Sequence, residues 1–284
     1  MMKLACLCPL TGRLRIACLT LLLALLAGAA SGRAATAPST SSEPKELPLP
    51  GELFHVSGRV AFLISAPNAS GANRPWLWYA PTLPRLPGSA ETWMFEHFLA
   101  AGIGVAGIDV GESYGSPAGQ ELYTALYTEM TSRRGYASKP VLLGRSRGGL
   151  MTLAWAAAHP NKVAGFVGIY PVCNLTSYPG LEKAAPAYQL SPEELRARLD
   201  EFNPLARLAS LARARVPLFA IHGDVDTLVP LAQNSLALKQ RYEALGGSMI
   251  LIIPPGQGHS MWTGFFQSQD LVDFVIAQAK PKRG

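Results

Sequence analysis

Cysteine and closely spaced metal ligands are scarce in this chain of 284 residues. Three of its four cysteines, Cys6, Cys8 and Cys18, lie near the N-terminus, and only Cys173 lies further along the chain. No His-x-x-x-His or Cys-x-x-Cys spacing occurs, and no glycine-rich loop of the phosphate-binding type follows the first expected strand. The sequence therefore predicts neither a metal site nor a bound cofactor.

Charged residues are also sparse, at 15% of the chain, whereas an average globular protein has about 25%. The formal net charge is +6, but residues 1–37 hold four basic residues and no acidic one, so the rest of the chain carries +6 minus 4, or +2. A balance so close to neutral gives no support to a nucleic-acid partner.

The one long apolar run lies between Ile16 and Ala30. It follows basic residues, precedes small residues that end in Ala35-Thr36-Ala37, and is shorter than the roughly 20 residues of a membrane-spanning helix. This pattern is typical of a secretory signal peptide, and an uncleaved membrane anchor is the alternative. We expect residues 1–37 to be removed, which leaves a secreted or periplasmic protein without stable membrane association and with Cys173 as its single cysteine.

Beyond this segment, residues 38–50 are rich in Ser, Pro and Glu and predict a flexible leader. Residues 51–284 are enough for one sizeable domain. Strand-like and helix-like stretches alternate there, which predicts an α/β fold with a mainly parallel sheet covered on both faces. The expected strands are 60–64, 76–79, 103–108, 140–143, 163–170, 218–221 and 249–253, and the expected helices are 91–101, 120–131, a helix from 150, 231–245 and 265–279.

The sequence Gly144-Arg145-Ser146-Arg147-Gly148 joins the buried strand at 140–143 to the apolar helix from Leu150. A serine on such a sharp turn stands clear of the sheet edge, and glycine at 144 and 148 lets neighbouring chain come close. Here the sequence resembles the α/β-hydrolase superfamily, a resemblance that covers about residues 60–279. It implies that Ser146 is a catalytic nucleophile.

A serine hydroxyl becomes a nucleophile when a histidine takes its proton and an acid steadies that histidine. The expected strand at 218–221 runs into His222-Gly223-Asp224-Val225-Asp226-Thr227-Leu228-Val229-Pro230. This stretch resembles the acid turn of α/β-hydrolases, and the resemblance implies that Asp226 is the catalytic acid. Asp224, directly after the glycine, is the alternative, although Asp at that place commonly binds turn amides.

Five histidines compete for the role of base: His55, His97, His159, His222 and His259. Only His259 follows the last expected strand, in the glycine-flanked loop Pro255-Gly256-Gln257-Gly258-His259. This loop matches the family's histidine loop and implies His259 as the base.

The resemblance also implies two donors for the oxyanion. One is the backbone N–H of Arg147, and the other comes from Ala80 or Thr82 in the loop after the strand at 76–79, because Pro81 between them has no N–H. Glucuronoyl esterases are similar in having arginine directly after their serine, which suggests an acidic or sugar-derived substrate. The alternative is that Arg145 and Arg147 pair with carboxylates such as Asp109 or Glu112.

Residues 173–215 interrupt the alternation of strands and helices, and Ser191-Pro192-Glu193-Glu194 is a capping box that predicts a short helix. We therefore expect a small helical insertion after the strand at 163–170, which corresponds to the sixth strand of the α/β-hydrolase fold, either as a cap over the site or as surface packing. The function predicted is an exported serine hydrolase that cleaves small-molecule or carbohydrate esters. A prolyl-oligopeptidase-like peptidase and a non-catalytic binding protein are the alternatives.

Overall fold

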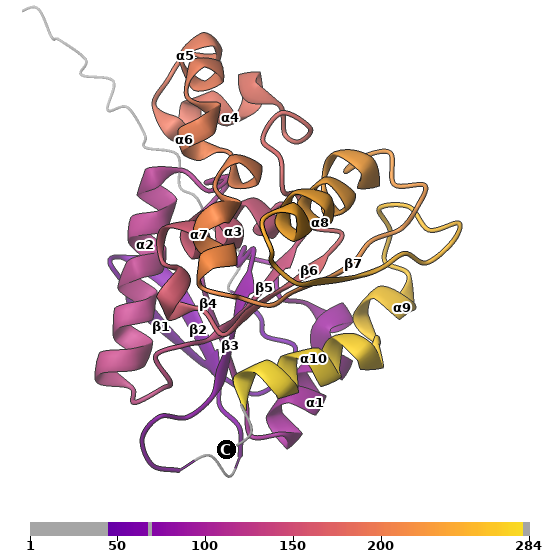
Figure 1. Ribbon diagram of the computed structural model, residues 1–284. Coiled ribbons are helices and arrows are strands. Elements are labelled where there is room, and N and C mark those ends of the chain that lie inside the picture. The colour runs from indigo at the N-terminus through magenta and orange to yellow at the C-terminus, as the bar shows by residue number, and fades with distance from the viewer. Residues whose placement is uncertain (1–44, 68–69, 281–284) are drawn as a thin grey trace, which may run out of the picture. The chain divides into compact units, whose positions relative to one another are not determined.

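The computed structural model describes residues 45–67 and 70–280. The expected signal peptide and the first part of the expected leader lie outside these residues. Figure 1 shows one sheet with helices on both faces. Its eight strands have the order β1-β2-β4-β3-β5-β6-β7-β8, and pairing is parallel from β4 to β8 and antiparallel between β1, β2 and β4. The α/β fold and the mainly parallel sheet are confirmed.

The strands lie close to the expected stretches, and one more precedes them. Their bounds are β1 Glu52–Val56, β2 Arg59–Ile64, β3 Trp76–Ala80, β4 Gly104–Ile108, β5 Val141–Arg145, β6 Gly165–Ile169, β7 Leu218–Ile221 and β8 Met249–Ile252. The sequence analysis missed β1, a mostly exposed strand joined to β2 by a tight turn in which Ser57 and Gly58 have φ of 48° and 74°. Its backbone pairing with β2 compensates for its weak apolar pattern.

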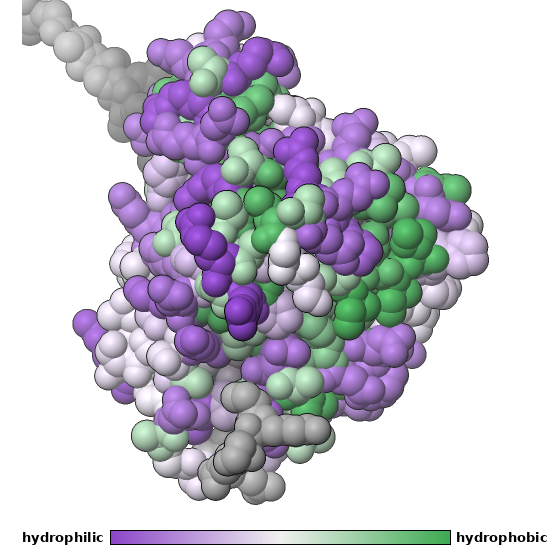
Figure 2. All heavy atoms as spheres, in the orientation of Figure 1, coloured by the Kyte–Doolittle hydropathy of each residue, from purple (hydrophilic) through white to green (hydrophobic). Residues whose placement is uncertain are grey.

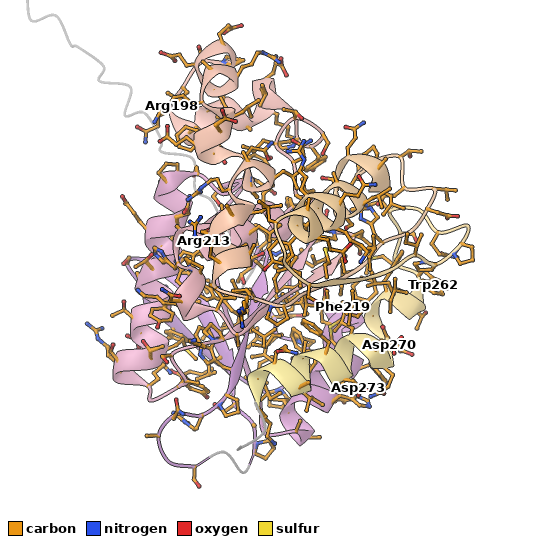
Figure 3. The ribbon with its side chains drawn as sticks, in the orientation of Figure 1. Arg198, Arg213, Phe219, Trp262, Asp270 and Asp273 are labelled. Atoms are coloured by element: carbon orange, nitrogen blue, oxygen red, sulfur yellow. The ribbon has the colours of Figure 1, made fainter. Side chains whose placement is uncertain are left out.

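Helices cover the sheet in two layers. One face packs on α2 (Pro117–Thr128), α3 (Gly148–Ala158), α7 (Leu208–Arg213) and α8 (Ser235–Ala244), and the other on α1 (Thr92–Ala100), α9 (Thr263–Phe266) and α10 (Gln269–Ala279). In Figure 3, Phe219 of β7 lies beside α10, whose Asp270 and Asp273 are on the side away from the sheet. The rings of Phe219 and Phe274 are 5.4 Å apart, so the apolar stripe of α10 faces the sheet.

Two expected helices are divided, and in each a polar side chain marks the break. The helix expected over 231–245 is a 3-10 turn followed by α8, because the buried side chain of Asn234 accepts hydrogen bonds from the N–H of Cys173 at 2.9 Å and the hydroxyl of Ser177 at 3.0 Å. The helix expected over 265–279 is α9 and α10, since Ser268 caps α10 by accepting from the N–H of Leu271 at 3.3 Å.

Part of the expected flexible leader is instead packed on the domain. The ammonium group of Lys45 donates to the carbonyls of Leu83 and Leu86, each at 2.5 Å, and Leu47 and Leu49 contact the core. Because these two leucines alternate with prolines in a segment rich in Ser, Pro and Glu, the composition of residues 38–50 did not indicate that they would pack on the core. The expectation of a flexible leader is therefore wrong for residues 45–50.

The helical insertion follows β6, as expected. It holds α4 (Leu181–Tyr188), α5 (Pro192–Ala197), α6 (Leu199–Phe202) and α7, and Ser191 and Glu194 form the expected capping box. Residues of α4 to α6 make a separate apolar cluster with Tyr114 and Leu150. In Figure 1 these three helices stand above one end of the sheet. Within the described ranges, no helix is long and apolar enough to span a bilayer.

The turn between β5 and α3 depends on close backbone contact. A Cβ on Gly148 would lie 2.2 Å from the carbonyl oxygen of Ala80, and one on Gly144 would lie 2.8 Å from the Cα of Gly149. No side chain fits at either position without movement of the backbone. The requirement for glycine at 144 and 148 is thereby confirmed.

We expect Gly148→Ala to destabilise the protein by about 1–3 kcal/mol, because the new methyl group overpacks a rigid contact with β3. Urea unfolding measures this loss. Gly165→Ala is the matched control, since its Cβ would meet the movable Cγ of Gln278 at 3.1 Å. Equal stability of the two variants would contradict this account of the turn.

Candidate active site

Ser146 occupies the turn between β5 and α3 with a φ of 51°, in the left-handed region. Its carbonyl accepts hydrogen bonds from the N–H groups of Gly149 at 2.9 Å and Val172 at 2.8 Å, and its own N–H donates to Ile169 at 2.9 Å. These bonds hold a backbone conformation that is costly for a residue with a Cβ. The side chain is thereby directed out of the sheet edge.

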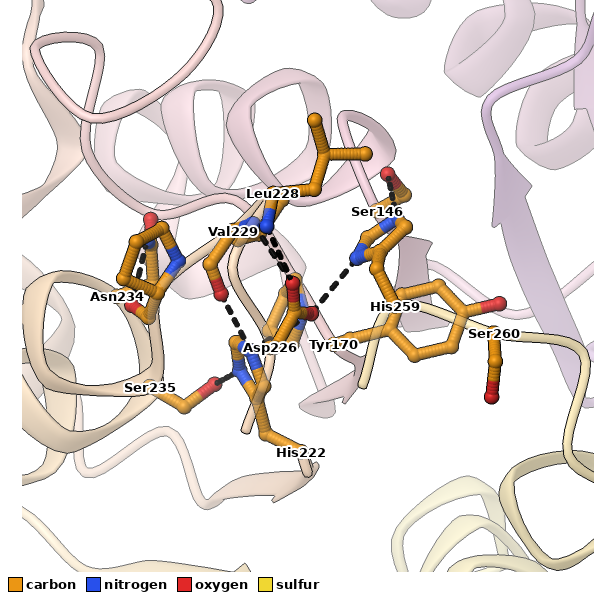
Figure 4. Close-up of polar contacts among 12 residues, drawn as sticks. Ser146, Tyr170, His222, Asp226, Leu228, Val229, Asn234, Ser235, His259 and Ser260 are labelled. Carbon is orange, nitrogen blue, oxygen red and sulfur yellow. Dashed lines mark hydrogen bonds and ion pairs between the residues drawn. The ribbon is translucent and has the colours of Figure 1, made fainter. Parts of the chain in front are cut away.

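The structure brings Ser146, His259 and Asp226 into one line of hydrogen bonds (Figure 4). The Oγ of Ser146 lies 2.9 Å from Nε2 of His259, and Nδ1 of His259 lies 2.7 Å from Oδ2 of Asp226. Because the Asp226 carboxylate accepts at Nδ1, that nitrogen carries the proton and Nε2 is free to accept from the serine hydroxyl. The order serine, imidazole, carboxylate is that of a proton-transfer relay.

The Asp226 carboxylate is buried and fully hydrogen-bonded. Its Oδ1 accepts from the N–H groups of Leu228 at 3.0 Å and Val229 at 2.8 Å, while Oδ2 faces His259. Burial alone would raise the pKa of Asp226, but hydrogen bonds from His222, His259 and Val229 outweigh burial and hold the pKa well below its ordinary value. Asp226 therefore stays ionised at neutral pH.

A second histidine, His222, also contacts Asp226. It is fully buried, and its Nε2 lies 2.8 Å from the carbonyl oxygen of Val229 and 3.3 Å from Oδ2 of Asp226. Its Nδ1 is 2.8 Å from the hydroxyl of Ser235. In the sequence His222 is only one of five candidate bases, and its place directly after β7, beside the acid turn, is the available signal that it braces the acid.

Asp224, the alternative acid, does not meet His259. Its Oδ1 accepts from the N–H of Gly256 at 2.7 Å, and the N–H of Val225 donates to the carbonyl of Gln257 at 3.1 Å. These bonds join the loop that carries Asp226 to the loop that carries His259. Asp224 therefore accepts a hydrogen bond from a backbone amide, as expected, but this amide belongs to the loop that carries His259.

The remaining histidines lie elsewhere. His55 is exposed on β1, and Nδ1 of His97 lies 2.8 Å from the carbonyl of Trp93. At the end of α3, Nε2 of His159 lies 3.5 Å from the hydroxyl of Thr124 in α2. Among the described residues, no cluster of three His, Cys, Asp or Glu side chains could hold a metal ion.

A cavity of about 250 Å³ opens at Ser146 and His259. Pro81, after β3, lines this cavity. Its neighbours Ala80 and Thr82, the expected sources of an oxyanion donor, are buried and do not line the cavity. The Thr82 hydroxyl instead donates to the carbonyl of Tyr79 at 3.3 Å. The N–H of Arg147 lies at the N-terminus of α3, where backbone N–H groups have no partner within the helix. The oxyanion role of Ala80 or Thr82 stays a prediction without support from their positions.

Both arginines beside the serine are paired with carboxylates. Nη1 of Arg145 lies 2.7 Å from Oε1 of Glu91, which is fully buried and also accepts from the hydroxyl of Tyr79 at 2.8 Å. Nε of Arg147 lies 2.9 Å from Oε2 of Glu112. Pairing with carboxylates is thus the arrangement observed, although the partner of Arg145 is neither Asp109 nor Glu112.

The aromatic rings of β3 and the helices of the insertion contribute little to the site. Trp76, Trp78 and Tyr79 are buried in the sheet, whereas Tyr170 lies beside the His259 ring at a centroid distance of 4.3 Å. From the insertion, Tyr178 lines the cavity. Among the described residues, α4 to α7 contribute no lining side chain, so the insertion is mainly surface packing.

The fold and this geometry define an α/β hydrolase, with a serine on the sharp turn after a parallel strand and an acid and a histidine after later strands. Residues 123–279 match the prolyl oligopeptidase family, and this range covers more than half of the chain. The chain belongs to that family. The resemblance to the α/β-hydrolase superfamily is confirmed.

Solved structures share this fold. A puromycin-hydrolyzing peptidase of Mycobacterium tuberculosis is 17% identical with a TM-score of 0.64, over 88% of this chain and 42% of its own. An acylaminoacyl peptidase of Pyrococcus horikoshii is 17% identical with a TM-score of 0.65, over 83% of this chain and 43% of its own. Est1E of Butyrivibrio proteoclasticus is 16% identical with a TM-score of 0.60, over 80% of this chain and 98% of its own.

The chain thus spans about two fifths of the length of these two peptidases. The structural similarity shows a common fold, but at identities this low it does not transfer an activity. No curated protein matches the sequence.

We expect the folded state to lose stability at acidic pH because the pKa of Asp226 is lower in the folded protein than in the unfolded chain. The contribution is complete above the unfolded value of about 4 and disappears as pH falls toward the lower folded value. Urea unfolding between pH 6 and 3 should show the wild type losing more stability than Asp226→Asn, which has no carboxylate to protonate. Parallel losses would contradict the assignment.

Proposed function

We propose that this protein is a serine hydrolase that cleaves carboxylic esters. The observation that carries the proposal is the line from Ser146 through His259 to Asp226, with distances of 2.9 and 2.7 Å. Both fall within the hydrogen-bond range that a nucleophile and its base need.

The proposed reaction has two stages. His259 takes the hydroxyl proton through Nε2 as the Oγ of Ser146 attacks the ester carbonyl, and it then gives the proton to the leaving alcohol. Water, activated by the same nitrogen, releases the acyl group from Ser146. Asp226 holds the imidazole tautomer and stabilises the imidazolium, while the Arg147 N–H at the start of α3 stabilises the oxyanion.

The lining of the cavity supports a substrate without a free amino terminus. The described residues that line the cavity are Pro81, Leu86, Arg145, Ser146, Arg147, Tyr170, Tyr178, Leu228, His259, Ser260 and Met261. None of them carries a carboxylate. A terminal ammonium group would find no counterion there. The lining therefore disfavours an acyl group that carries a positive charge.

A serine peptidase is the second candidate, and the family match over residues 123–279 favours it. A third, a non-catalytic binding protein, finds no support in the site because all three side chains of the relay are in contact. Secretion, proposed from the sequence of residues 1–37, concerns residues that the structure does not describe.

Hydrolysis of short-chain, aryl, acetyl-sugar and uronate esters, measured beside a prolyl amide, tests the proposal. We expect esters to be cleaved and the prolyl amide to be cleaved far more slowly. Ser146→Ala should lower the turnover number about 10⁴-fold or more, as loss of a triad nucleophile does. Cleavage of the prolyl amide at the rate of esters would favour the peptidase, and cleavage of neither by folded protein would favour the binding protein.

The sequence also suggested an acidic or sugar-linked ester, on the basis of Arg147. Because Glu112 pairs with that guanidinium, we propose that neutral esters are preferred. Arg147→Ala should therefore lower kcat/KM by a similar factor for a neutral methyl ester and for the matching uronate ester. A loss confined to the uronate ester would restore the acidic substrate.

A further inference from the structure

Exposed apolar side chains lie at the cavity and on the two loops beside it. Eight large apolar residues stand out as exposed in the described part of the chain, and four of them lie on the two loops that carry Asp226 and His259: Val225 at 54%, Leu228 at 52%, Met261 at 56% and Trp262 at 40%. We call these four residues the apolar rim. Leaving so much apolar surface in water is unfavourable by about 25 cal/mol per Å², so its concentration at one site indicates a binding role.

The surroundings of the rim are visible in three figures. Figure 2 shows apolar residues gathered on the side of the molecule where α8, α9 and the loops before them lie. Figure 3 places Trp262 at that edge. Leu228 extends beside Ser146 and His259 in Figure 4.

The two loops that bear the rim are fixed to each other. A Cβ on Gly223 would lie 2.0 Å from the carbonyl oxygen of Gln257, so the loop backbones touch. The hydrogen bonds from Gly256 to Asp224 and from Val225 to Gln257 cross the same junction. Trp262 packs edge-on against Phe265 at a ring distance of 5.2 Å. The rim is therefore formed before a ligand arrives, which lowers the entropic cost of binding.

The rim continues directly from the cavity. Leu228 and Met261 belong to both, and the Sδ of Met261 lies 2.9 Å from Nη2 of Arg145, which positions it at the mouth. The cavity holds about 250 Å³, below the roughly 300–1,000 Å³ of most ligand sites. The rim gives a ligand that is larger than the cavity an apolar surface to extend over, beginning at Leu228 and Met261.

We propose that the apolar rim binds the aliphatic chain of the substrate, so that the preferred substrates are neutral esters with a medium-length or long acyl chain. This proposal rests on the proposed ester hydrolase function. The carbonyl would sit at Ser146, the first carbons would fill the cavity, and the rest of the chain would lie across Leu228, Met261 and Trp262.

The test compares kcat/KM for p-nitrophenyl acetate, butanoate, hexanoate and octanoate. Each buried methylene contributes about 0.8 kcal/mol, so we expect kcat/KM to rise by up to about fourfold per methylene. In the double variant Leu228→Asn/Trp262→Ser, the ratio of octanoate to acetate kcat/KM should fall about tenfold or more.

The matched control is Leu245→Asn, which replaces an exposed leucine, 50% exposed, at the far end of α8. It should leave the octanoate to acetate ratio unchanged. An unchanged ratio in the rim variant, or an equal fall in the control, would overturn the proposal.

Equilibrium binding separates this proposal from the proposed function. Trp262 fluorescence of Ser146→Ala, corrected with Ser146→Ala/Trp262→Phe, is titrated with methyl octanoate and methyl acetate. Tighter binding of the octanoate supports the rim even if the wild type hydrolyses no ester, in which case only the proposed function fails. Equal binding of the two esters by Ser146→Ala, beside ester hydrolysis by the wild type, overturns the rim and leaves the function standing.

Discussion

The contact between Ser146 and His259 depends on a junction between two loops at one edge of the sheet. Parallel strands end at the same edge, so β5, β7 and β8 deliver the serine, the acid and the histidine to one place although the residues are far apart in sequence. Backbone contact between Gly223 and Gln257 then sets the distance from Asp226 to His259. A side chain at position 223 would separate the two loops and with them the acid and the base.

A second layer of contacts holds the three side chains in place. His222 and the N–H groups of the turn after Asp226 fix its carboxylate, and the Tyr170 ring lies against His259. Arg145 joins this layer from the other side: it pairs with the buried Glu91, and its Nε lies 3.2 Å from the hydroxyl of Tyr170. Arg145 is thus part of the scaffold, because its carboxylate partner is buried, whereas Arg147 and Glu112 form a more exposed pair beside the cavity.

The sequence predicted the sheet and the relay residues because their signals are local. Glycine on both sides of Ser146, the turn after the strand that ends before His222, and the glycine-flanked loop of His259 each specify backbone geometry within a few residues. Other features depend on distant partners. Glu91 lies 54 positions before Arg145, and nothing between them indicates which carboxylate packs under the arginine. The break at Asn234, the packing of Leu47 and Leu49, and the exposure of Val225 and Trp262 likewise follow from tertiary contacts that a local pattern does not encode.

In the proposed mechanism His259 activates Ser146 as a nucleophile. Reaction with a fluorophosphonate probe, followed by mass spectrometry of the intact protein and of its peptides, tests this most directly. We expect one added phosphonate on Ser146 of the wild type, formed at least about 100-fold more slowly in a folded His259→Gln variant. Labelling at another residue, no labelling of folded wild type, or equal rates in the two proteins would contradict it.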